Sequence, residues 1–207
     1  MGRQPRARCI AFEGSRCIAS GELQQVALKT KEVIDREGYS PILIFDETTS
    51  ELIEVDFRGT ADEVLQRAAA MTSRDAPSAA SAPTEKEAPR GPGRPKLGVV
   101  AREVTLLPRH WEWLNSQPGG ASVALRRLVE ETRRANAGRD RVRRSQEAAY
   151  RFMSAMAGNE RGFEEATRAL FAANQERFDA LVETWPVDIR DHARNLAVVA
   201  FRGSSTG

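Results

Sequence analysis

The predicted fold of the central region depends on residues 89–108, which read PRGPGRPKLGVVAREVTLLP. A stiff basic peptide at 89–96 leads through a short apolar spacer into a predicted strand at 102–107. The residues that follow, RHWEWLNSQPGGASVALRRLVEET at 109–132, have the apolar periodicity of two amphipathic helices. Pro118-Gly119-Gly120 separates these helices, at 109–117 and 121–132. The stretch therefore predicts a basic peptide, a strand and two helices in succession.

Charge is unevenly distributed along the chain, although the formal net charge is only +2. Residues 89–151 carry 14 basic and 6 acidic side chains, whereas residues 1–70 carry 9 basic and 12 acidic ones. Clustered basic charge favours a polyanionic partner, because phosphate contacts release condensed counterions. The alternative is that many of these charges lie on solvated helix faces.

Residues 8–71 are predicted to form a small α+β domain with the order β-β-α-β-β-α. Its first hairpin would place Phe12 opposite Cys17 and Cys9 opposite Ser20, so the two cysteines would not face each other and should be free thiols. The second hairpin would pair strands at 42–45 and 52–57, because apolar and acidic residues alternate in 53–57. Thr60 and Glu63 fit a capping box that would begin the last helix of this domain.

The rest of the chain divides into a linker and a helical domain. Residues 72–98 are rich in Ala, Ser, Pro, Glu and Gly and lack periodicity, which predicts a disordered linker that contains the basic peptide at 89–96. Residues 99–202 would form a strand plus helical domain, with an all-α bundle at 145–202 and Phe171 in one of its buried stripes. The arginine-dense segment 133–144, interrupted by Gly138, fits either a continued helix or a break.

No catalytic, metal or cofactor site is predicted. The only histidines are His110 and His192, which fall in separate predicted helices, and no Cys-x-x-Cys, phosphate-binding glycine loop or serine elbow is present. No apolar run is long enough for a membrane span or a signal peptide, so the expected location is the cytoplasm. The protein is therefore expected not to be an enzyme.

The basic peptide resembles an AT-hook, whose extended Gly-Arg-Pro core lies in the narrow minor groove of A·T-rich DNA. Such grooves attract arginine through their enhanced negative potential. In this chain Pro92 stands where the family pattern has an arginine before the central glycine, and a Pro/Gly/Arg linker without function is the alternative. The residues that the resemblance assigns to DNA are Arg90, Gly93, Arg94, Pro95 and Lys96.

Residues 102–134 resemble a ribbon-helix-helix domain, in which two protomers pair their strands into an antiparallel ribbon that enters the major groove. The resemblance implies a homodimer, because one protomer cannot bury the strand alone. It also implies that the backbone at Ser122, at the start of the second helix, holds a phosphate. The basic residues that would contact DNA are Arg102, Arg126, Arg127, Arg133 and Arg134, and the shared core would contain Trp111, Leu114, Leu125, Leu128 and Val129.

The predicted ribbon is unusually apolar on its base-reading face. Alternation from Pro108 places Arg102, Val104 and Leu106 on that face, where Val104 and Leu106 can contact thymine methyl groups but cannot read donors and acceptors. A β-bulge or a shifted register would exchange the base-reading face of the strand with its inward face. A strand and two helices packed on the C-terminal helices in an unrelated fold is the alternative to the ribbon.

The chain from about Cys9 to Ala197 resembles an uncharacterised bacterial family, a domain of unknown function numbered twenty-two thirty-nine. The segments that carry the resemblance are GRPKLGVVAREVTLLPRHW at 93–111, QPGGAS at 117–122 and QEAAYRFMSAMAG at 146–158. This family resemblance implies no activity.

The functional hypothesis is a dimeric cytoplasmic DNA-binding protein, a transcriptional regulator or nucleoid-associated factor that contacts A·T-rich DNA. The alternative is a protein-interaction module whose N-terminal domain binds a partner protein and whose basic region is solvated surface.

Overall fold

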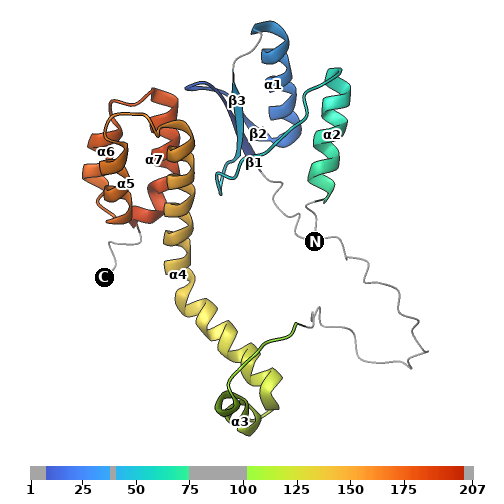
Figure 1. Cartoon of the computed structure of the whole chain (residues 1–207), viewed down its shortest axis with the longest axis vertical. Helices are drawn as coiled ribbons and strands as arrows, with labels where there is room; N and C mark the ends of the chain where they lie inside the picture. Colours follow the sequence, from blue (N-terminus) through green and yellow to red (C-terminus); the bar gives the residue numbers. More distant parts are fainter. Residues whose placement is uncertain (1–7, 38–40, 75–101, 203–207) are drawn as a thin grey trace, which may run out of the picture. The chain divides into compact units, whose positions relative to one another are not determined.

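The computed structural model describes residues 8–37, 41–74 and 102–202. The chain divides into two compact units (Figure 1), a sheet unit of residues 1–78 and 138–207 and a hairpin unit of residues 79–137. The predicted AT-hook-like peptide at 89–96 and residues 75–98 of the predicted linker lie outside the described residues. The fold is α+β, with a small N-terminal sheet followed mostly by helices.

The sheet has three antiparallel strands in the order β2-β1-β3, formed by β1 (Arg8–Glu13), β2 (Arg16–Glu22) and β3 (Ile42–Asp46). The predicted first hairpin is confirmed, with Phe12 opposite Cys17. Cys9 lies opposite Gly21 rather than Ser20, because the register shifts between Ala11 and Phe12. Neither Cys9 nor Cys17 is in a disulfide, as expected.

Helices α1 (Leu23–Glu37) and α2 (Ala61–Arg74) cover one face of the sheet. The predicted capping box begins α2, because the Thr60 amide donates to Glu63 Oε2 at 2.7 Å and the Glu63 amide donates to Thr60 Oγ1 at 3.4 Å. The cluster beneath these helices contains Cys9, Ala11, Leu23, Val26, Ala27, Ile44, Val64 and Ala68.

The predicted fourth strand is reduced to a single bridge, so the observed order is β-β-α-β-α rather than β-β-α-β-β-α. Leu52 bridges Phe45, and the Ile53 amide donates to the Ile44 carbonyl at 2.8 Å. Beyond Ile53 the alternation persists, with Val55 and Phe57 packed on the cluster under α1 and α2. The alternation of apolar and acidic residues therefore predicted correctly which side chains are buried. It could not predict whether another strand would pair with this segment.

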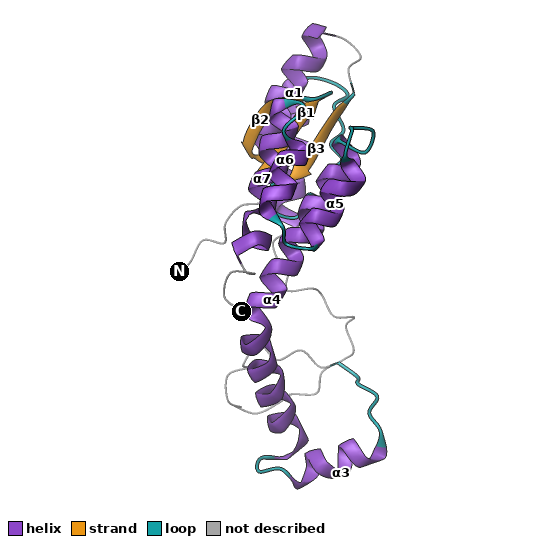
Figure 2. Cartoon of the chain, turned by 90° about the vertical axis from the view of Figure 1, so that its left-hand side faces the viewer, coloured by secondary structure: helices purple, strands orange, loops and turns teal. Residues whose placement is uncertain are grey.

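The other face of the sheet packs against C-terminal helices of the same unit. These are the end of α4 (Gly120–Met156), α5 (Phe163–Phe171), α6 (Gln175–Val182) and α7 (Val187–Arg202). One cluster joins Ile10, Phe12 and Phe45 of the sheet to the helical segment. Its helical members include Phe152, Met153, Leu170, Phe178, Trp185 and Ile189. The sheet is thus buried on both faces, and Figure 2 views it from the side of the C-terminal helices.

The hairpin unit contains α3 (Pro108–Ser116) and the first part of α4, at the positions predicted for two helices. Residues 133–144 belong to α4, so the helix continues through Gly138 without a break. In this single chain residues 102–107 form no strand, since an isolated strand has no partner for its backbone N–H and C=O groups. Among the described helices, none combines the length and apolar character needed to cross a bilayer.

Candidate nucleic-acid interface

The turn between α3 and α4 fixes where the second helix of the hairpin begins. Gly119 and Gly120 have φ of +86° and +74°, a left-handed conformation that glycine adopts without strain. A Cβ at Gly119 would lie 3.1 Å from the Val123 side chain, so this position has little room for another residue. The turn places Ser122 in the first turn of α4, which contains no acidic residue. The backbone there is therefore suited to an anion.

Four of the predicted DNA-binding arginines lie on one face of α4. Arg126 and Arg133 are seven residues apart, as are Arg127 and Arg134, and seven residues correspond to two helical turns. All four side chains are exposed. Arg126 Nε donates to the Ser122 carbonyl at 2.9 Å, which directs this guanidinium toward the N-terminus of the helix.

Acidic neighbours offset part of this charge. Glu130 accepts from Arg133 at 2.8 Å and from Arg134 at 3.0 Å, and Arg127 lies 3.8 Å from Glu131. The hydrogen bond from Arg133 lowers the pKa of Glu130 and raises the pKa of Arg133. Exposed pairs of this kind contribute little to stability, because solvent and salt screen them. The arginines can therefore exchange these carboxylates for phosphates at small cost.

The hairpin unit leaves much of its apolar surface uncovered. Among its described residues, 102–137, the only buried side chains are Leu114 and Ala124. Seven large apolar side chains are between 36% and 63% exposed: Val104, Leu107, Trp111, Trp113, Val123, Leu128 and Val129. Trp111, Leu128 and Val129, which the sequence assigns to a shared dimer core, are thus exposed in the single chain.

The remaining predicted site residues are not brought together in the described chain. Arg102 is exposed and lies in the irregular segment that precedes α3. The five residues of the AT-hook-like peptide lie outside the described residues: Arg90, Gly93, Arg94, Pro95 and Lys96.

A model of a protein family matches residues 8–197, from β1 to α7, and so includes both units. The chain belongs to the DUF2239 family. The family's description is "uncharacterized protein conserved in bacteria", so the predicted membership is confirmed. No curated protein and no solved structure matches this DUF2239 chain.

Sequence reasoning missed Trp113 as a residue of this surface of the DUF2239 chain. Trp111 and Trp113 are two positions apart on α3, which separates their directions by about 200°. Both side chains therefore cannot enter one shared core. Trp113 is 49% exposed and shares its face of α3 with Arg109 and His110. In the sequence, Trp113 could have been recognised as an aromatic residue that lies outside the apolar stripe of α3.

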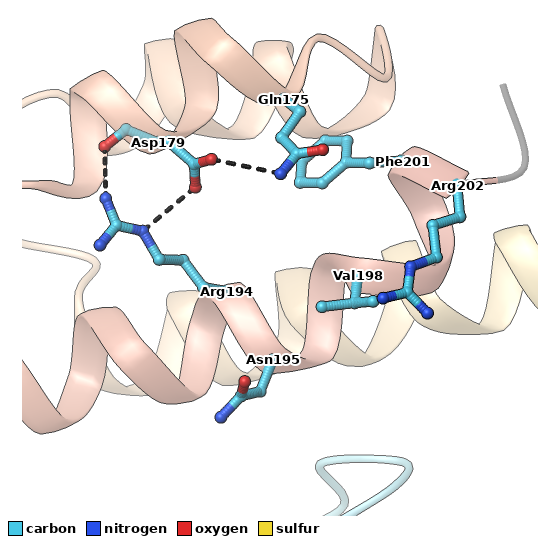
Figure 3. A pocket seen from close by; sticks show the side chains of 7 residues that line it. All are labelled: Gln175, Asp179, Arg194, Asn195, Val198, Phe201 and Arg202. Atoms are coloured by element: carbon cyan, nitrogen blue, oxygen red, sulfur yellow. Dashed lines mark hydrogen bonds and ion pairs between the residues drawn. The ribbon is translucent and has the colours of Figure 1, made fainter. Parts of the chain in front are cut away.

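A pocket between α6 and α7 was also not predicted (Figure 3). It has a volume of about 420 Å³ and is lined mainly by polar side chains. Arg194 Nε donates to Asp179 Oδ1 at 3.1 Å. Its Nη2 donates to Glu183 Oε2 at 2.7 Å. Arg194 is therefore neutralised by carboxylates of α6 and its C-terminal end. Within the described segments, no cluster of three or more His, Cys, Asp or Glu residues is placed to hold a metal ion.

Proposed function

We propose that this protein is a dimeric DNA-binding protein, a transcriptional regulator or nucleoid-associated factor whose hairpin unit contacts A·T-rich DNA. The observation that carries the proposal is that one short helical hairpin exposes both a cluster of arginines and large apolar side chains. One face of its second helix carries four exposed arginines, and the hairpin also exposes large apolar side chains that a single chain leaves uncovered.

The uncovered apolar surface supports a second copy of the chain as the partner. An isolated hairpin with two buried side chains has too small a core to be stable alone. Residues 102–107 would pair with the same residues of the second copy, and Trp111, Leu125, Leu128 and Val129 would fill the shared core. This arrangement is the ribbon-helix-helix-like architecture.

DNA contacts would then come from both copies. The first turn of α4 at Ser122 would hold a phosphate on backbone N–H groups, and Arg102, the first residue of the ribbon, would help to position the ribbon on phosphates. Arg126, Arg127, Arg133 and Arg134 would supply sequence-independent phosphate contacts. The peptide with Arg90, Gly93, Arg94, Pro95 and Lys96 would add a minor-groove contact in A·T-rich DNA.

The test is binding of a fluorescent A·T-rich duplex, followed by anisotropy from about 50 to 200 mM salt. The proposal expects affinity to fall steeply with salt and to fall further in an Arg133→Gln, Arg134→Gln variant. Arg36→Gln, which removes an exposed arginine from α1, is the matched control and should change little. Absence of binding at low salt, or binding without salt dependence, would refute the proposal.

Dimerisation is tested separately by sedimentation equilibrium. The expected mass is twice the 22.9 kDa of one chain. Leu128→Glu should shift the protein to monomer, because it places a charge in the proposed shared core, whereas Val199→Glu on α7 should not. A monomeric wild-type protein would contradict the proposed ribbon, because the ribbon needs a strand from each of two copies.

A protein-interaction module is the second candidate, and the ion pairs of Glu130 and Glu131 favour it because they offset part of the basic charge. The two candidates differ in the role of the basic peptide. Arg94→Ala with Lys96→Ala should weaken duplex binding if the protein binds DNA. The same variant should leave a protein-interaction activity intact.

A further inference from the structure

Two aromatic side chains of the sheet unit lie together on its surface. Tyr150 of α4 and Phe171 of α5 are 43% and 50% exposed, and their ring centroids are 5.9 Å apart. The rings are tilted by 60° rather than stacked on each other, so ring faces remain available to a ligand. Phe171 was predicted as part of a buried stripe, and its exposure is a correction.

The two helices hold this aromatic pair in place. Ala149 and Leu170, the neighbours of the two rings in the chain, are both fully buried in the core shared with the sheet. Gln146 Nε2 of α4 also donates to the Leu170 carbonyl of α5 at 3.2 Å. The exposed rings therefore project from two packed helices.

Each ring of the aromatic pair has a basic side chain one or two turns before it on its own helix. Arg143 lies two turns before Tyr150 on the same face of α4, and Arg168 lies one turn before Phe171 on α5. Residues 139–151 of α4 contain five arginines and two carboxylates. Arg143 pairs with Asp140 at 3.0 Å, and Arg168 lies 3.6 Å from Glu165. These pairs are exposed and open to exchange with phosphates.

We infer that the Tyr150–Phe171 pair binds single-stranded nucleic acid by stacking unpaired bases on its rings. Aromatic side chains next to basic ones are the usual means of holding single strands, because every base has a π-face and every nucleotide a phosphate. On the face of α4 that carries Tyr150, Arg139 and Arg143 outnumber the one carboxylate at helical spacing from the ring, Glu147, and this surplus favours a nucleic acid over an apolar protein surface. The inference does not rest on duplex binding by the hairpin unit.

The test is the affinity of the full-length protein for fluorescent oligo(dT), measured by anisotropy at low salt. Phe171→Ala and Tyr150→Ala should each raise the dissociation constant by about fivefold or more, the range known for one lost stacking contact. Val187→Ala removes a similarly exposed side chain from α7 and should not change the affinity. Thermal unfolding of each variant verifies that the fold persists.

Two comparisons separate stacking from other contacts. Phe171→Leu keeps the apolar bulk but removes the ring, and should weaken binding as Phe171→Ala does, whereas Phe171→Tyr should restore it. An abasic oligonucleotide of equal length should bind more weakly than oligo(dT). The inference is overturned if wild-type protein does not bind oligo(dT), if both alanine variants bind as wild type, or if Phe171→Leu does. The last result would show that apolar bulk at position 171, and not stacking on an aromatic ring, supports binding.

Discussion

At the scale of single residues, His192 shows how burial changes a side chain's chemistry. Its ring centroid lies 4.5 Å from that of Phe152 and 5.8 Å from that of Phe12, and its Nε2 has no hydrogen-bond partner among the described residues. Burial lowers its pKa, and the charge of Glu47 acts more weakly in the opposite direction. The structure therefore accommodates the neutral imidazole.

His192 should make stability depend on pH. Its folded-state pKa lies below the value of about 6.5 expected in the unfolded chain, so below that pH the unfolded state binds more protons. The contribution of neutral His192 is complete above pH 6.5 and is lost as pH falls toward the folded-state pKa. Urea unfolding measures this at pH 8, 7, 6 and 5. As the pH falls, the free energy of unfolding of the wild type should decrease relative to that of His192→Leu. If the difference in free energy of unfolding between wild type and His192→Leu stayed constant with pH, the pKa of His192 would not be lowered in the folded state.

At the scale of elements, sequence patterns predicted the helices well because their signals are local. The buried stripes of the C-terminal helices and the capping box of α2 each depend on residues within a few positions of one another. The fourth strand needed a neighbour along its length, and residues beyond Ile53 have none. The exposure of Phe171 likewise depends on what packs against α5, which periodicity does not give.

The candidate interface was predictable only where its features depend on residues close together in the sequence. Seven-residue spacing alone places Arg126 with Arg133 and Arg127 with Arg134 on one face of a helix. The pairing of Arg133 and Arg134 with Glu130, and of Arg127 with Glu131, follows from spacings of three and four residues. The exposure of Trp113, and the contact between Tyr150 and Phe171, require knowledge of which faces remain uncovered.

Two glycines, one before α4 and one inside it, should respond in opposite ways to alanine. Gly119→Ala, in the turn before the helix, forces a side chain into φ of +86° beside Val123, which should cost about 1–2 kcal/mol. Gly138→Ala, in the helix interior, meets no atom within 4 Å and should stabilise the helix by about 0.5–1 kcal/mol. Urea unfolding followed by far-ultraviolet circular dichroism measures both. A stabilising Gly119→Ala would show that the turn geometry is different.

At the scale of the whole molecule, segments far apart in sequence share one core. Phe12 and Phe45 of the sheet pack with Phe152 of α4, at centroid distances of 5.3 Å and 5.4 Å from its ring. The sequence marks each of these residues as apolar, but apolar periodicity gives a buried face without naming its partner. β1 is buried on both sides, so the sheet lies between α1 and α2 on one face and the C-terminal helices on the other.

This shared core predicts that residues 8–74 and 138–202 unfold together. Phe12→Ala removes a fully buried ring that contacts both Phe152 and His192, and changes of this kind typically cost about 3–5 kcal/mol. Trp185 reports on the helical segment, because it is buried in the same cluster and its Nε1 donates to the Arg161 carbonyl at 3.1 Å.

The measurement uses Trp185 fluorescence during urea unfolding, in a background where Trp111→Phe and Trp113→Phe remove the other two tryptophans. Phe12→Ala should lower the midpoint reported by Trp185, although Phe12 lies more than 170 residues away in the sequence. Leu52→Ala, which truncates an exposed side chain beside the same sheet, is the control and should leave the midpoint nearly unchanged. If Phe12→Ala left the Trp185 transition in place, the two segments would be independent folding units that merely touch. A lowered midpoint with an unchanged slope would instead mean that the sheet and the C-terminal helices stabilise each other as one cooperative structure.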